Sequence, residues 1–150
     1  MEACPVHTDS GKYIQLIGKG LDKDAYLVAR SSNPFASVCG RICAAPCEDA
    51  CRRGKIDEPI TIRSLKRFVT EKYGVESHVA HTQDLLIDGE KIPHGSIWPL
   101  HIPSIVKRTG SEKNSKVAVI GGGPSGLACA HDLVLRGYNV TIFEASNTLG

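Results

Sequence analysis

Apolar residues in the first 75 positions recur at helical spacing in three segments, which are separated by residues typical of turns. The first segment can be capped by Asp9 or Ser10, whose side chains can accept hydrogen bonds from the first turn. The second segment opens at Asp22 and is broken by the dipeptide Asn33-Pro34, because the residue before a proline disfavours helix. This pattern predicts a mostly helical unit over residues 1–75.

The third helical segment follows a cysteine-rich region. Thr61 is its predicted N-cap and Gly74 its predicted stop. The residues expected on its buried side are Ile62, Leu65, Phe68 and Val69. Such a unit contains few large apolar residues, and domains of this size often depend on a metal or a crosslink for stability.

The pattern changes twice after residue 75. Residues 76–115 lose helical periodicity, contain several prolines and end in a polar stretch, which predicts a linker. From residue 116, an apolar run over 116–120, a helical pattern ending at Gly137 and an apolar run over 139–143 follow in order. This order predicts the first βαβ unit of a Rossmann-type (α/β) domain. Because one such unit leaves its sheet uncovered, the domain over 116–150 is expected to be truncated and the chain to be the N-terminal portion of a longer protein.

Composition is that of an ordinary globular chain, with 41% hydrophobic and 23% charged residues. A net charge of +2 predicts no nucleic-acid binding and no membrane attachment. The N-terminus lacks the basic start and apolar core of a signal peptide. A cytoplasmic location is therefore expected, in which thiols stay reduced and available to metal.

Five of the six cysteines lie in the first 51 residues, which suggests that they act together. Cys39, Cys43, Cys47 and Cys51 follow one another at a spacing of four, and Cys4 lies upstream. The intervening Gly40 and Pro46 argue against one uninterrupted helix, so we expect short helical turns that direct the thiols inward.

Thiols gathered in this way are suited to an iron–sulfur cluster or to zinc. Zinc sites more often contain paired C-x2-C sequences, which this region lacks. Inert buried thiols and disulfides are two further interpretations, although disulfides require an oxidising compartment. Spacing favours the cluster and leaves zinc and structural thiols open.

A second motif follows the apolar run at 116–120. Gly121, Gly123 and Gly126 form G-x-G-x-x-G, with Pro124 and Ser125 between the last two glycines. Such glycines allow a tight turn, the approach of backbone amides to a pyrophosphate, and close packing of helix on strand. The helix that follows, in which Cys129 is expected to face the packing side, supplies free N–H groups for phosphate.

An acidic residue, Glu144, ends the second apolar run. Its carboxylate can accept hydrogen bonds from both ribose hydroxyls and disfavours a 2′-phosphate, so the site is expected to bind FAD or NAD(H) in preference to NADP(H).

The ordered set of motifs resembles the glutamate synthase small-subunit family, which includes the N-terminal part of dihydropyrimidine dehydrogenase. The residues that carry the resemblance span the whole chain and are Cys4-Pro-Val-His-Thr-Asp9, Asn33-Pro34, Val38 through Cys51, Pro59 through Leu65, and Gly121 through Gly126. The resemblance implies a helical ferredoxin-like domain with [4Fe-4S] clusters, followed by an FAD domain. It also implies that NAD(P)H binds in a further domain, outside this chain.

By position, the resemblance implies cluster ligation by Cys4, Cys43, Cys47 and Cys51, whereas Cys39 matches a cysteine that is not clearly a ligand in every member. Members with two clusters have further cysteines upstream of the position of Cys4, so the partners expected for Cys51 are absent from this chain. Some members complete a cluster with Gln or Glu where this chain has Lys66, whose ammonium is no ligand. One cluster is therefore expected.

Four basic residues around the cysteines, Arg41, Arg52, Arg53 and Lys55, either form a solvated turn or offset the negative charge of a cluster and so raise its reduction potential. The sequence shows no acid, base or nucleophile for substrate chemistry, because flavin and cluster would carry out the redox reaction.

The function expected is the electron-transfer portion of an FAD-dependent NAD(P)H oxidoreductase, which passes electrons between flavin and a [4Fe-4S] cluster. A catalytic partner subunit or fused domain would accept the electrons. Two different functions stay open: a non-catalytic domain that docks a partner, and a zinc-stabilised domain fused to an NAD-dependent dehydrogenase.

Overall fold

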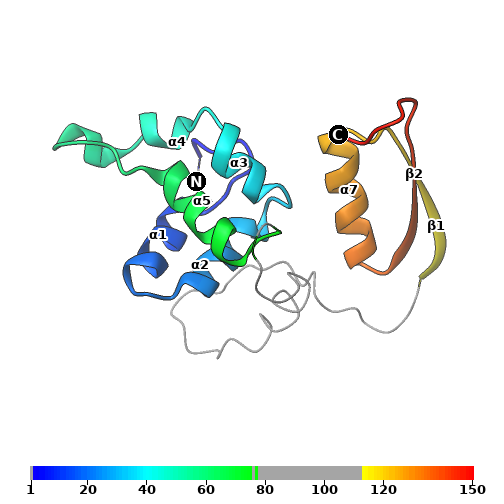
Figure 1. Ribbon diagram of the computed structural model, residues 1–150, viewed down its shortest axis with the longest axis horizontal. Coiled ribbons are helices and arrows are strands. Elements are labelled where there is room, and N and C mark those ends of the chain that lie inside the picture. Colours follow the sequence, from blue (N-terminus) through cyan, green and yellow to red (C-terminus); the bar gives the residue numbers. More distant parts are fainter. Residues whose placement is uncertain (1, 76, 78–112) are drawn as a thin grey trace. The chain divides into compact units, whose positions relative to one another are not determined.

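The computed structural model describes residues 2–75, 77 and 113–150, which belong to two compact units divided between residues 102 and 103 (Figure 1). Almost all of the predicted linker over 76–115 lies outside the described residues. Each unit is considered by itself.

The first unit is helical, as predicted. Its helices are α1 (Ser10–Gly18), α2 (Asp22–Ser31), α3 (Ala36–Ile42), α4 (Pro46–Asp49) and α5 (Ile62–Tyr73), with a 3₁₀ turn η1 (Arg52–Lys55) between α4 and α5. Asp9 is the N-cap of α1 and accepts a hydrogen bond of 3.0 Å from the backbone N–H of Lys12. Thr61 and Gly74 flank α5, so the predicted boundaries of that helix are confirmed.

The core of this unit lies where α1 and α2 pack against α5. Tyr13 and Val69 are completely buried, and Tyr26 is nearly so. The hydroxyl of Tyr13 donates a buried hydrogen bond of 2.9 Å to the carbonyl oxygen of Ile62, which ties α1 to the first turn of α5. An internal hydrogen bond of this kind stabilises a fold by roughly 1 kcal/mol.

The predicted buried side of α5 is partly wrong. Phe68 is 43% exposed, whereas Lys66 is only 8% exposed. The buried stripe of the helix runs through Ile62, Lys66, Val69 and Thr70, at steps of four, three and one residues. Phe68 follows Ile62 by six residues, which turns the helix by about 240° between them and takes Phe68 off that stripe.

Gly40 lies inside α3, and the expected interruption of the helix in the cysteine region occurs further along, at Ala45 and Pro46. A β-carbon at Gly40 would lie 3.0 Å from the Cα and 3.1 Å from the backbone N of Arg67 on α5. Gly40 therefore allows α3 and α5 to pack backbone against backbone, and this requirement explains a glycine inside the helix.

The second unit contains the predicted strand, helix and strand. Strand β1 (Lys113–Ile120) pairs in parallel with β2 (Tyr138–Phe143), with Val117 opposite Val140, and α7 (Pro124–Leu135) connects them (Figure 1). The βαβ order is therefore confirmed. Within this unit, Ile120 is 81% and Phe143 is 55% exposed, as expected for a two-stranded sheet with one covering helix.

Among the described residues, no helix combines the length and the apolar character that crossing a membrane requires.

We predict that Gly40→Ala lowers the free energy of unfolding of the first unit by about 1 kcal/mol. Overpacking typically costs about 1–3 kcal/mol and would exceed the gain of roughly 1 kcal/mol in helix propensity. Urea denaturation followed by circular dichroism measures the change. Gly18→Ala is the matched control, because a β-carbon at Gly18 would meet nothing within 4 Å. Equal stability of both variants would contradict the packing role of Gly40.

Candidate functional site

Four thiols line one pocket in the first unit, which we call the thiol pocket. They are Cys4 from the turn before α1, Cys39 from α3, Cys43 at the C-terminal cap of α3, and Cys47 from α4. The pocket encloses about 410 Å³, part of which is open to solvent. The structure thus brings together four of the five cysteines that the sequence marked as metal ligands.

A sharp turn between α3 and α4 brings Cys47 to the same pocket as Cys39 and Cys43. Ala45 adopts a left-handed conformation (φ 57°, ψ 49°), and its backbone N–H donates to the sulfur of Cys43 at 3.3 Å. Pro46 begins α4, a position where a missing N–H costs nothing. The prediction of short helical turns in place of one helix is therefore confirmed.

Hydrogen bonds and burial set the protonation of these thiols. Burial alone would raise the pKa of Cys4, but N–H groups of Thr8 and Val6, the hydroxyl of Thr8 and the charge of Lys66 bring that pKa below its ordinary value. Burial, followed by the proximity of Cys4, Cys43 and Glu48, raises the pKa of the Cys47 thiol. Proximity to other sulfurs thus disfavours several thiolates together unless a positive partner stabilises them.

The sulfur of Cys39 has a dedicated donor. The side-chain amide of Asn33, which is only 5% exposed, donates to this sulfur at 3.0 Å. The amide oxygen of Asn33 accepts from the backbone N–H of Phe35 at 2.9 Å, and this second bond fixes the orientation of the amide. N–H donors of this kind orient sulfur ligands and tune the metal that they hold.

Cys51 does not line the thiol pocket. It precedes η1, where backbone N–H groups of Ile60, Arg53 and Gly54 lower the pKa of its thiol despite a small opposing effect of burial. Its predicted ligation therefore stays a prediction and does not involve this pocket. In the second unit, Cys129 is exposed on α7, so the expectation that it faces the packing side is wrong.

The donor set of the thiol pocket consists of sulfur atoms from three segments. Soft thiolates of this kind bind iron–sulfur clusters and zinc. Cys4, Cys39, Cys43 and Cys47 would be the residues to hold such a group. Within residues 2–75, 77 and 113–150, no group of three or more His, Cys, Asp or Glu side chains has the arrangement of a site for a single metal ion.

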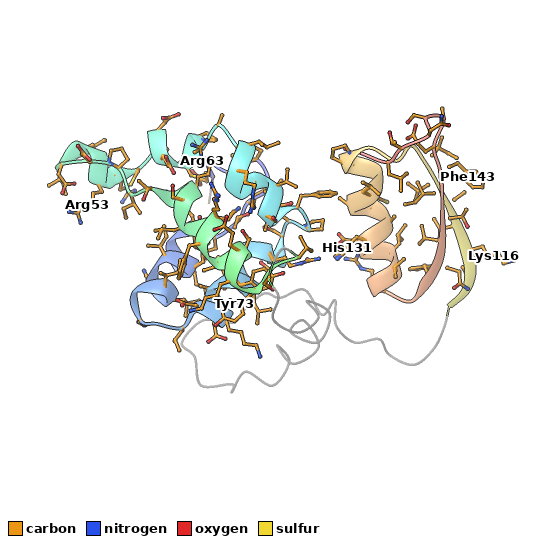
Figure 2. The ribbon with its side chains drawn as sticks, viewed as in Figure 1. Arg53, Arg63, Tyr73, Lys116, His131 and Phe143 are labelled. Carbon is orange, nitrogen blue, oxygen red and sulfur yellow. The ribbon has the colours of Figure 1, made fainter. Side chains whose placement is uncertain are left out.

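Two cationic side chains from α5 also line the pocket. Arg63, labelled in Figure 2, donates to the carbonyl oxygen of Cys43 at 2.7 Å, and its own backbone N–H donates to the carboxylate of Glu48 at 2.7 Å. Lys66 is buried beside Thr8 and Tyr13. From the sequence alone, Lys66 could be identified only as a residue that cannot ligate iron. Its spacing of four residues from Ile62 and three from Val69 is the sequence feature that could have predicted its burial.

None of the four basic residues that flank the cysteines in the sequence lines the thiol pocket. Arg41 is exposed and forms an ion pair with Glu71 at 3.1 Å, and Arg53 forms an exposed pair with Asp57. Arg52 and Lys55 are also exposed. The electrostatic interaction of solvated or paired charges of this kind with a distant group is weak.

The glycine loop of the second unit has the geometry that a phosphate-binding turn requires. Gly121 has φ +101°, a value that glycine adopts readily, and a β-carbon at Gly126 would lie 1.9 Å from the carbonyl oxygen of Gly121. A β-carbon at Gly123, the N-cap of α7, would meet nothing within 4 Å. Space therefore remains beside Gly123 for a ligand at the start of this helix, where Pro124 and Ser125 follow.

Glu144 lies directly against this loop. Its carboxylate accepts hydrogen bonds from the backbone N–H of Gly122 at 2.6 Å and from both the N–H and the hydroxyl of Ser146 at 2.8 Å. These donors, with the Ser146 N–H strongest, lower the pKa of Glu144 to about 2. The carboxylate is thus a fixed negative charge beside the loop, where it can accept further bonds from hydroxyl groups.

Two family models match the chain. Residues 1–78 match dihydropyrimidine dehydrogenase domain II, which carries a 4Fe-4S cluster, and residues 119–150 match an NAD(P)-binding Rossmann-like domain. The first match contains the whole thiol pocket, and the second contains the glycine loop and Glu144.

Curated relatives are similar over almost the entire chain. The subunit beta of an NADP(+)-dependent formate dehydrogenase from Moorella thermoacetica is 39% identical over all of this chain and 21% of its own length. The subunit beta of an NADPH-Fe(3+) oxidoreductase from Geobacter sulfurreducens is 34% identical over 97% of this chain and 18% of its own length. The small chain of a glutamate synthase [NADPH] from Bacillus subtilis is 33% identical over 98% of this chain and 25% of its own length. The chain thus spans between 18% and 25% of the length of these relatives.

We predict that Ser146→Ala raises the pKa of Glu144 from about 2 toward its ordinary value of 4.5, because the variant loses the hydroxyl donor but keeps both backbone donors. Titration of the side-chain carboxyl ¹³C shift by NMR measures the pKa. Because folding lowers this pKa, ionised Glu144 stabilises the second unit above pH 4.5, and that contribution disappears as the pH falls toward 2. Ser115→Ala, an exposed change on β1, serves as the control and should leave the titration of Glu144 unchanged.

Proposed function

Because the chain belongs to the dihydropyrimidine dehydrogenase domain II family, which carries a 4Fe-4S cluster, we propose that its helical unit holds one [4Fe-4S] cluster and that its βαβ unit binds FAD. Together they would form the electron-transfer portion of an NAD(P)H oxidoreductase. The proposed domains are residues 1–75 for the cluster, 76–115 for a linker and 116–150 for the start of the FAD domain. The observation that carries this proposal is the convergence of four thiols from three segments on one pocket.

The thiol pocket would hold the cluster through Cys4, Cys43 and Cys47, with Cys39 as the fourth sulfur that lines it. The backbone N–H groups of Thr8 and Val6 support a thiolate at Cys4, and the N–H of Ala45 donates a hydrogen bond to the sulfur of Cys43. Asn33 supplies the equivalent donor at Cys39. Each of these donors stabilises charge on sulfur, which a metal-bound thiolate requires.

The glycine loop would hold the dinucleotide. Backbone N–H groups at the start of α7 face the space beside Gly123 and suit a pyrophosphate, while Glu144 suits ribose hydroxyls and repels a 2′-phosphate. FAD meets both requirements. NAD(P)H would bind in a domain outside this chain.

A bound flavin accepts hydride as an electron pair, and a bound cluster transfers single electrons. In this proposal the described residues supply the two binding sites, and flavin and cluster would carry out the redox reaction. The relatives are named as oxidoreductase subunits, which supports a partner subunit or fused domain as the electron acceptor.

We predict that Cys43→Ser and Cys47→Ser each remove most of the iron and acid-labile sulfide from the anaerobically purified full chain and weaken its broad absorbance near 400 nm. Serine is a poor ligand for iron, so the cluster would lose one of its attachments. Iron and sulfide assays provide the measurement, and Cys129→Ser in the other unit is the matched control. Full iron content in both pocket variants would show that the assignment of Cys43 and Cys47 as ligands is wrong, whereas a colourless protein that contains zinc would reject the cluster.

We predict that Gly126→Ala reduces the bound flavin at least tenfold, because the added methyl group collides with the carbonyl of Gly121 and displaces the loop. Flavin released by heat and identified by chromatography measures the occupancy. Glu144→Gln should weaken binding while α7 stays folded, and Gly18→Ala in the other unit is the control. Release of a nicotinamide nucleotide in place of FAD would show that the cofactor assignment is wrong.

A further inference from the structure

Lys66 is a buried cation that no carboxylate among the described residues pairs with. Its side chain is only 8% exposed. Its Nζ lies 3.4 Å from the hydroxyl of Thr8 and 6.0 Å from the centre of the Tyr13 ring, both of which are neutral groups. In the part of the chain that the structure describes, no carboxylate forms an ion pair with it.

Other lysines in this unit are placed differently. Lys72, on the same helix, is about half exposed and forms an ion pair with Asp22 at 2.6 Å. Burial of an ammonium without a counter-charge is costly, and long basic side chains usually reach solvent. The burial of Lys66 is therefore a feature that needs an anion to balance it.

The thiol pocket provides the place for that anion. Lys66 lines this pocket together with Cys4, Cys39, Cys43 and Cys47. Within the pocket, Arg63 is the other cation, but it is exposed and bonded to a backbone carbonyl, so solvent screens its charge. Lys66 is the buried cation of the pocket, and its charge interacts more strongly with other charges because the protein interior screens them less than water does.

We propose that Lys66 is a positioning residue that supplies the counter-charge for a thiolate-ligated cluster in this pocket and raises the reduction potential of that cluster. This inference rests on the proposed function. One-electron reduction adds one negative charge to the cluster and neither makes nor breaks a bond, so a nearby fixed cation favours the reduced form. In this role Lys66 is not a ligand of the cluster, since an ammonium has no lone pair to donate.

The test is the midpoint potential of the cluster in the anaerobically loaded full chain, measured by electron paramagnetic resonance during titration with dithionite and redox mediators. Lys66→Met should lower the midpoint by at least about 59 mV, which is a tenfold smaller ratio of reduced to oxidised cluster. Lys66→Arg keeps the charge and should stay near the wild-type value. Lys72→Met removes an exposed, paired charge from the same helix and should cause no shift.

A second measurement uses the protein without its iron–sulfur cluster, which is called the unloaded protein. Without an anion in the pocket, removal of the buried ammonium should increase stability, so unloaded Lys66→Met should have a higher urea midpoint than unloaded wild type. Insertion of the cluster should then raise the urea midpoint of the variant by less than it raises the midpoint of the wild-type protein. This comparison holds even if the variant takes up little cluster.

The possible outcomes separate the two proposals. A wild-type protein free of iron and labile sulfide would overturn the proposed function and this inference with it. A wild-type protein that contains the cluster, together with a Lys66→Met variant of unchanged potential, would overturn this inference alone. Lower stability of the unloaded variant would also overturn it, because Lys66 would then already be balanced within the protein.

Discussion

The packing of α3 against α5 at Gly40 fixes the geometry of the thiol pocket. At this point the two backbones approach so closely that a β-carbon at Gly40 would lie 3.0 Å from the Cα of Arg67. Cys39 precedes Gly40 directly, and Lys66 precedes Arg67 directly. Because Cys39 and Lys66 both line the thiol pocket, this contact between helices sets where a sulfur and a cation lie relative to each other.

In the second unit, a glycine also allows a close contact between two backbone segments. There, the absence of a side chain at Gly126 allows the start of α7 to meet the carbonyl of Gly121. The resulting turn leaves the space beside Gly123 open at the N-terminus of the helix. In each unit a glycine lets two backbone segments approach, and the ligand groups are neighbours of that contact.

Features with a local cause could be predicted from the sequence. Asp9, Thr61 and Gly74 mark helix ends, and the order of strand, glycines and helix identifies the βαβ unit, because each depends on a few consecutive residues.

Features with a distant cause could not be predicted. The burial of Lys66 depends on Thr8 and Tyr13, more than 50 residues away, and periodicity favoured the more apolar Phe68 for the core. A spacing of four also suggested that Cys51 would join the other thiols. The left-handed turn at Ala45 and the end of α4 before Ala50 interrupt that periodicity, and Cys51 lies outside the pocket.

The bond between Glu144 and the N–H of Gly122 has a consequence for ligand recognition. It ties the glycine loop to the residues that follow β2, and Ser146 donates to the same carboxylate. A loop held by such bonds loses less conformational entropy on association, so more of the contact energy with a ligand appears as affinity. In the proposed function, the acidic side chain would thus order the free loop and would also meet the sugar of the dinucleotide.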